Sequence, residues 1–161
     1  AGLDVIGDGE QRPALEKLAA QLGISHRVHF AGHAPESYLK QQLTRASVFA
    51  MPSRAELQSI ATMEAMASGL PVIGANAMAL PHLIHDGENG YLYEPGDVDQ
   101  FAALLTKVFT MPHDELLELK RESLRIVQGH DINRTLDTFE ALYRGEPVVD
   151  PVADDVGTVA P

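Results

Sequence analysis

Cysteine is absent from the 161-residue sequence, and long apolar runs are absent too. Without cysteine no disulfide can hold the fold, which is consistent with a reducing compartment. A membrane-spanning helix needs roughly 20 consecutive apolar residues, and no run approaches that length. We therefore expect a cytoplasmic protein. Membrane association would come only through a part of the protein outside this sequence, which would place the full-length protein at the membrane surface.

Basic residues are scarce. Lysine and arginine number 12 against 23 aspartates and glutamates, which gives a net charge of −11. Such an acidic surface disfavours nonspecific binding to nucleic acid or to an anionic membrane, although it leaves room for a local basic pocket. We predict no nucleic-acid partner. With 45% hydrophobic residues, the chain is apolar enough and long enough for a globular domain with a sizeable core.

Two common phosphate-binding signatures are also missing. The sequence contains no Gly-x-x-x-x-Gly-Lys-Ser/Thr loop. Gly7-Asp8-Gly9 follows an apolar segment, but Arg12 stands where the dinucleotide fingerprint requires its third glycine. A Rossmann dehydrogenase is therefore disfavoured.

Seven histidines raise the question of a metal site. His29 and His33 flank an expected strand end. His82 and His85 lie near an expected short helix. No cysteine is available, and no second ligand group has the spacing typical of zinc sites. Structural or surface roles are favoured, and we predict no metal.

Strands and helices alternate along the first two-thirds of the sequence. Short apolar segments bounded by turn residues predict strands, and apolar residues three and four positions apart predict helices. The expected strands are 3–6, 28–31, 48–51, 71–74 and 91–93, and the expected helices are 11–22, 35–45, 57–68, 97–109, 113–127 and 132–143, with one or two helical turns at 78–85. This order implies an α/β fold, a Rossmann-like doubly wound parallel sheet with helices on both faces.

We expect one domain over residues 1–145 and a tail over residues 146–161. The tail contains acids and prolines but no basic residue, which predicts that it is disordered or loosely attached. Strand-forming residues open the sequence with no turn or cap before them, so we expect that it begins inside a larger protein. Residues 132–145 are expected to expose an apolar patch that favours self-association.

The most informative stretch is 52–73, in which Glu56 and Glu64 stand eight positions apart. A strand ends at Pro52, and ligands of parallel sheets bind beyond such ends, against a helix N-terminus. The amides of residues 57–60 could meet a diphosphate, and each carboxylate could accept hydroxyls of a sugar. On a helix, Glu64 would lie about 12 Å beyond Glu56, which suits a nucleotide sugar. The alternative is that Glu56 only caps the helix and Glu64 lies on a solvated face.

The stretch from Pro52 to Ile73 resembles the signature of family 4 of the retaining glycosyltransferases with the GT-B fold, also called group 1. The C-terminal domain of that family has a Pro-Ser turn, a glutamate, and a second glutamate eight positions on. Glu-Ala-Met-Ala-Ser-Gly-Leu-Pro-Val-Ile follows there, as it does at residues 64–73. Residues 5–9, 28–32 and 86–92 resemble further family segments in the same order. The resemblance covers roughly residues 3–110.

The resemblance implies a role for several residues and a partner, a nucleotide diphosphate sugar. Donor-sugar contacts would come from Glu56, Leu57, Gln58 and Ser59; diphosphate contacts from Gly7, Ser59 and Ile60; the ribose contact from Glu64; and a base contact from the main chain of His29. None of these residues is assigned a catalytic role. The resemblance implies no metal and no other cofactor.

The sequence also departs from the family pattern. Ser59 stands where glycine is frequent, and Met78-Ala79 and His82 replace a glycine pair and a glutamate. These changes leave the sugar of the donor open. Gln58-Ser59 resembles a variant of lipid glycosyltransferases, which implies a lipid or a glycan as a candidate acceptor and leaves its identity open.

The basic pair and the N-terminal acceptor domain of the family do not occur in this sequence. We expect the donor half of the enzyme, inactive alone, because both reactants must be held in one geometry. Two alternatives remain open: another GT-B enzyme, such as a nucleotide-sugar epimerase or a phosphorylase, and a non-catalytic nucleotide-sugar-binding module whose acidic tail contacts a partner.

Overall fold

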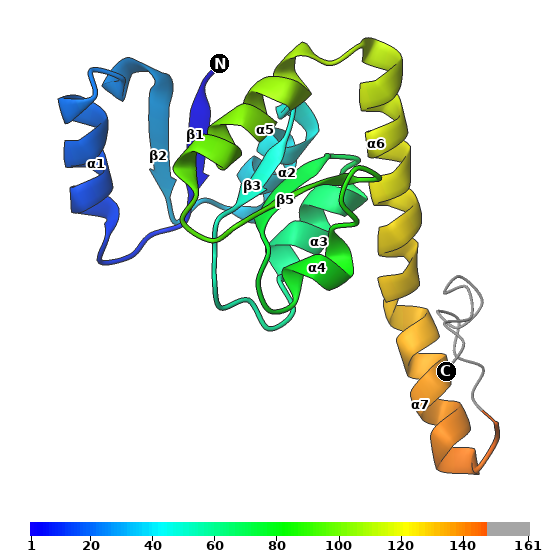
Figure 1. The fold of residues 1–161 in the computed structure, drawn as a ribbon. Coiled ribbons are helices and arrows are strands. Elements are labelled where there is room, and N and C mark those ends of the chain that lie inside the picture. The colour runs from blue at the N-terminus through cyan, green and yellow to red at the C-terminus, as the bar shows by residue number, and fades with distance from the viewer. Residues whose placement is uncertain (148–161) are drawn as a thin grey trace. The chain divides into compact units, whose positions relative to one another are not determined.

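The computed structural model describes residues 1–147, in two compact units that divide after Arg45 (Figure 1). The single domain predicted for residues 1–145 spans both units and stays a prediction. From residue 148 onward the predicted tail lies outside the described residues. Within residues 1–147, no helix is long and apolar enough to cross a membrane.

The first unit, Ala1–Arg45, is a β-α-β arrangement followed by a helix. It consists of β1 (Leu3–Ile6), α1 (Arg12–Gln21), the 3-10 helix η1 (Ser25–Arg27), β2 (Val28–Gly32) and α2 (Glu36–Arg45). The two strands are parallel, with Leu3 opposite Val28. Pro13 lies in the first turn of α1, where its missing N–H leaves no helical hydrogen bond unmade.

The second unit begins at Ala46 and contains a three-stranded parallel sheet in the order β3-β4-β5. Its elements are β3 (Phe49–Met51), α3 (Ile60–Ala67), β4 (Val72–Ala75), α4 (Leu80–Leu83), β5 (Gly90–Tyr93), α5 (Val98–Thr110), α6 (His113–Val127), the 3-10 helix η2 (Gln128–His130) and α7 (Ile132–Arg144). All four residues of the central strand β4 are buried, because neighbours cover both of its faces. The parallel α/β architecture predicted from the sequence is confirmed.

The core of the second unit lies around β4. Met66 of α3, Ile73 of β4 and Ile84 after α4 are completely inaccessible to solvent. The turn that leads into β4 is fixed from α6, since the buried hydroxyl of Ser123 donates to the carbonyl of Leu70 at 2.7 Å. This core holds the sheet in place, so the loops at the strand ends start from fixed positions.

The expected helix 57–68 is shorter than predicted. Its end is as expected, since Gly69 adopts φ +71° just beyond α3. The predicted start at residue 57 is three residues too early. Ser59 has φ +52° and cannot belong to a right-handed helix. Glu56 therefore lies in a loop four residues before Ile60, the first helical residue. The 12 Å helical separation of Glu56 and Glu64 is wrong for the same reason.

Candidate functional site

Three loops of the second unit leave the same edge of its parallel sheet, which we call the carboxyl edge. They are residues 52–59 after β3, residues 76–79 after β4 and residues 94–97 after β5. The amide of Ala79 donates to the carbonyl of Glu56 at 3.1 Å and joins the first two loops. The amide of Asn76 donates to the carbonyl of Tyr93 at 2.8 Å, which joins the second strand end to the third. Ligands of parallel sheets bind at such an edge.

The amino terminus of α3 is the most polar feature of this edge. Ser59 occupies the capping position, but its hydroxyl lies 2.7 Å from the Thr62 hydroxyl and caps no amide. The amides of Thr62 and Met63 donate to the Ser59 carbonyl. Among residues 1–147, no acceptor is found for the amides of Ile60 and Ala61. Two unbonded N–H groups and the helix dipole make this end attractive to an anion.

Both predicted acids lie near that helix start. Glu56 is half-buried in the loop, and Glu64 is exposed on the second turn of α3. Neither carboxylate has an ion pair or hydrogen bond with another described side chain. Ile60 and Glu64 are four residues apart on the helix, a rise of about 6 Å. The two carboxylates thus remain available to accept hydroxyl groups, one before and one after the unbonded amides along the chain.

The remaining residues of this unit that were predicted to contact the sugar or the diphosphate lie at the same helix start. Leu57, Gln58 and Ile60 are exposed, whereas Ser59 is buried. Core packing does not explain why Leu57 and Ile60, three positions apart in the chain, are both exposed. The structure thus brings five predicted residues together, namely Glu56, Leu57, Gln58, Ser59 and Ile60, with Glu64 one helical turn further on.

Arg54 is a further charged residue of the carboxyl edge, to which the sequence analysis assigned no role. An alanine Cβ at Gly96 would lie only 2.5 Å from the Arg54 Nη2 atom, so the guanidinium reaches from the β3 loop to the β5 loop. The positive charge of Arg54 also acts on Tyr93. Burial raises the pKa of the Tyr93 phenol, and the electrostatic interaction with Arg54 opposes that rise. The position of Arg54 directly after a strand end was the available signal. It supplies a cation to an edge that also carries Glu56 and Glu94.

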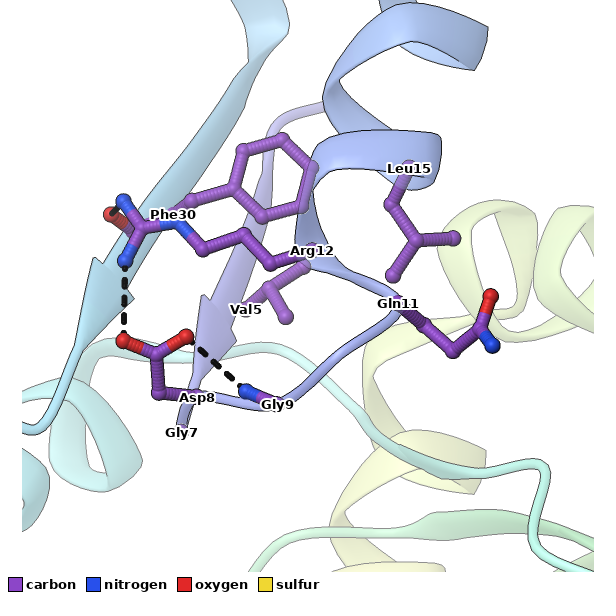
Figure 2. Close-up of a pocket in the computed structure, with 8 residues that line it drawn as sticks. All are labelled: Val5, Gly7, Asp8, Gly9, Gln11, Arg12, Leu15 and Phe30. Atoms are coloured by element: carbon purple, nitrogen blue, oxygen red, sulfur yellow. Dashed lines mark hydrogen bonds and ion pairs between the residues drawn. The ribbon is translucent and has the colours of Figure 1, made fainter.

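Gly7 and His29, which were also predicted to contact the ligand, belong to the first unit. Gly7 has φ +129° and donates its amide to the carbonyl of Gly32 at 3.0 Å. Gly7 lines a cavity of about 250 Å³ together with Asp8, Arg12 and Phe30. Figure 2 shows these lining residues. The Arg12 guanidinium pairs with Asp8 and Glu16 and donates to the Phe30 carbonyl, so its charge is already compensated.

His29 lines a second cavity of the first unit, of about 210 Å³. Its Nδ1 atom lies 3.3 Å from the Asp4 carboxylate and 3.3 Å from the Tyr38 hydroxyl. The predicted contact of its main chain with a base stays a prediction, as does the role of Gly7.

Met78 in the β4 loop has a strained backbone, with φ +51° and an exposed side chain. A left-handed conformation costs a non-glycine residue about 1 kcal/mol. We expect Met78→Gly to raise the free energy of unfolding by up to about 1 kcal/mol, measured by urea denaturation. Ala102→Gly in α5 is the control, because glycine inside a helix lowers stability by about the same amount. Equal losses in both variants would contradict the strain argument.

Histidines form no metal site in the described part of the chain. Within residues 1–147, no group of three His, Cys, Asp or Glu side chains is arranged to hold a metal ion. His85 instead lies 3.3 Å from the Glu88 carboxylate on the turn before β5. The polar groups of the carboxyl edge described above include unbonded amides, carboxylates and the Arg54 guanidinium.

Comparison with known proteins identifies the family to which this chain belongs. Residues 1–124 match the family described as glycosyl transferases group 1. Sulfoquinovosyl transferase SQD2 of Arabidopsis thaliana is 37% identical over 117 residues, which are 71% of this chain but 22% of that protein. The chain thus spans about a fifth of the length of that relative.

Two solved structures are similar as well. The C-terminal domain of a glycosyl transferase group 1 family protein (LpcC) from Francisella tularensis is 28% identical with a TM-score of 0.65, covering 75% of this chain and 63% of that one. The pneumococcal O-GlcNAc transferase GtfA, in complex with UDP and GlcNAc, is 25% identical with a TM-score of 0.76, covering 89% and 29%. This chain belongs to the glycosyl transferases group 1, family 4 of the GT-B glycosyltransferases, and corresponds to their C-terminal half.

Proposed function

We propose that residues 1–145 form the donor-binding domain of a retaining glycosyltransferase. The full-length enzyme would move a hexosyl group from a nucleotide diphosphate sugar to an acceptor. The observation that carries this proposal is the α3 start, where unbonded amides are preceded along the chain by one unpaired carboxylate and followed by another. An anion suits the amides, and hydroxyl groups suit the carboxylates. A nucleotide sugar offers these groups in that order.

Each residue has a role in this proposal. The ribose hydroxyls bind Glu64, and the diphosphate binds the amides of Ser59 and Ile60. The donor sugar binds Glu56 and the backbone of Leu57 and Gln58. In the first unit, Gly7 admits the diphosphate to the backbone, and the main chain of His29 contacts the base.

The chemistry of the chain's own groups is electrostatic. When the sugar leaves, negative charge grows on the diphosphate, and amides aimed at it stabilise that charge without reorganising. The acceptor attacks from the face that the diphosphate leaves. We assign no nucleophile on this chain. Transfer by these residues alone is not expected, because the acceptor has to be held against the donor by another part of the protein.

Binding of UDP provides the first test, and the complex of GtfA with UDP and GlcNAc supports the choice of probe. We expect Glu64→Ala to weaken UDP binding roughly 10- to 100-fold, as expected for a lost hydrogen bond to a charged group. Isothermal titration calorimetry measures the dissociation constants. Glu115→Ala, an exposed acid in the first turn of α6, is the matched control and should leave binding unchanged. If Glu64→Ala binds UDP as tightly as the parent chain, the ribose contact is wrong.

A Glu56 variant distinguishes the contribution of the sugar to the affinity from that of the nucleotide. The Glu56→Ala variant should bind UDP like the parent chain but lose the additional affinity for a UDP-sugar. The class of reaction is tested on the full-length protein, by separating transferred sugar from epimerised sugar. Epimerised sugar without transfer would replace the proposal with the epimerase alternative.

A further inference from the structure

Helix α3 is preceded by a serine with an unusual backbone conformation. Ser59 has φ +52° and ψ +61°, which lies in the left-handed region, and the residue is only 5% exposed. Glycine adopts this conformation without strain, whereas a residue with a Cβ adopts it at a cost in free energy. A favourable contact elsewhere in the structure therefore has to hold Ser59 in place.

The side chain of Ser59 makes that contact with Thr62. The two hydroxyl oxygens lie 2.7 Å apart, within hydrogen-bond distance, and Thr62 is completely inaccessible to solvent. Within residues 1–147, neither hydroxyl has another hydrogen-bond partner. Because both groups are buried, water cannot replace a missing partner, and each hydroxyl depends on the other.

The hydroxyl pair also keeps the serine away from the amides of the helix. A serine before a helix is usually extended, and its hydroxyl accepts from the second or third amide of the helix. In α3 these amides belong to Ala61 and Thr62. The Thr62 amide donates to the Ser59 carbonyl at 2.9 Å, and the Ala61 amide has no acceptor in the described part of the chain. Since the Ser59 hydroxyl is bonded to the Thr62 side chain, the Ala61 amide stays free for an anion.

We propose that Thr62 is a positioning residue of the donor site. Being fully buried, it cannot reach a ligand itself. It binds the Ser59 hydroxyl, holds Ser59 in the left-handed conformation, and thereby leaves the amides of Ile60 and Ala61 free for a diphosphate. A serine can then occupy a position where glycine is frequent in the family. This inference rests on the proposed function, because it requires a diphosphate at the start of α3.

The test is an NMR titration of the isotope-labelled 161-residue chain with UDP and with uridine, which lacks the diphosphate. In the parent chain, UDP should shift the amide signals of Ile60 and Ala61, and uridine should not. Thr62→Val keeps the shape of the side chain but removes its hydroxyl, so that the Ser59 hydroxyl can turn to the Ala61 amide. We expect the affinity for UDP to fall at least about tenfold, as for a lost hydrogen bond to a charged group, and the affinity for uridine to stay unchanged.

Two further variants separate positioning from a general loss of structure. Thr62→Ser keeps the hydroxyl and should bind UDP as the parent chain does. The double variant Ser59→Gly with Thr62→Val should recover the affinity that Thr62→Val loses, because glycine adopts a positive φ unaided and brings no hydroxyl to the amides. Thr106→Val, at an exposed threonine of α5, is the matched control and should leave both affinities unchanged.

Several results would overturn the positioning role. Thr62→Val could bind UDP as tightly as the parent chain, or lose affinity for uridine and UDP alike, as expected for a purely structural residue. The double variant could also stay as weak as Thr62→Val, in which case the loss does not arise from the Ser59 hydroxyl. If UDP binds the parent chain without shifting the signals of Ile60 and Ala61, this inference fails although nucleotide binding stands. If the parent chain binds neither ligand, the proposed function fails as well.

Discussion

Gly90→Ala should unfold the sheet of the second unit. Gly90 lies opposite Val72 where β5 pairs with β4. A Cβ at this position would lie 1.8 Å from the Val72 carbonyl oxygen and 2.8 Å from the Val72 nitrogen. The obstacle is the backbone of the buried central strand, so no side-chain rotation can relieve it. We expect a loss of at least about 3 kcal/mol in the free energy of unfolding, at the upper end for overpacked sites.

Urea denaturation followed by circular dichroism measures this loss, or the absence of a folding transition. Gly129→Ala in η2 is the matched control, since its Cβ would have no atom within 4 Å. It should change stability by less than about 0.5 kcal/mol, like most exposed substitutions. If both variants unfold at the parent's urea concentration, β5 does not pair with β4 in this register.

Asn89→Ala should have the second-largest effect. The side chain of Asn89 is fully buried in the turn before β5. Its Oδ1 atom accepts from the amide of His85 at 2.8 Å, and its Nδ2 donates to the carbonyl of Leu83 at 3.0 Å. Alanine would leave a cavity and would deprive both backbone groups of their partner. We expect a loss of about 2–4 kcal/mol, the sum of a vacated volume and of unmade hydrogen bonds.

The control for Asn89 is Asn76→Ala. Asn76 is an exposed asparagine whose side chain donates to Glu94 at 3.3 Å, and water can replace that contact. Thermal melting of both variants should show a clear drop for Asn89→Ala and little change for Asn76→Ala. A parent-like melting temperature in Asn89→Ala would mean that the turn rearranges and satisfies Leu83 and His85 in another way.

Local signals in the sequence explain which elements were predicted well. Helix α6 has the predicted bounds, because Pro112 precedes it and its apolar residues recur with helical spacing. Helix α3 was predicted three residues too long at its start. Residues 57–59 continue the apolar spacing of the helix, so periodicity alone includes them. The left-handed Ser59 breaks the helix there, and no spacing rule signals that conformation.

In the candidate site, too, some residues could be predicted from local signals in the sequence and others could not. Glu56 and Glu64 were found from their spacing and from a family signature, both of which are read along the chain. The place of Arg54 could not be read along the chain, because its proximity to Gly96 joins two loops more than 40 residues apart.

The sequence by itself determined the order of strands and helices, the family, and the identity of the two acids. These properties depend on periodicity, on turn residues and on a contiguous motif. Only the tertiary structure decided that the Glu56 loop is held by the amide of Ala79 and that the amides of Ile60 and Ala61 stay unbonded. The physical reason is that such contacts join separate loops at one sheet edge, and packing around β4 sets the distance between those loops.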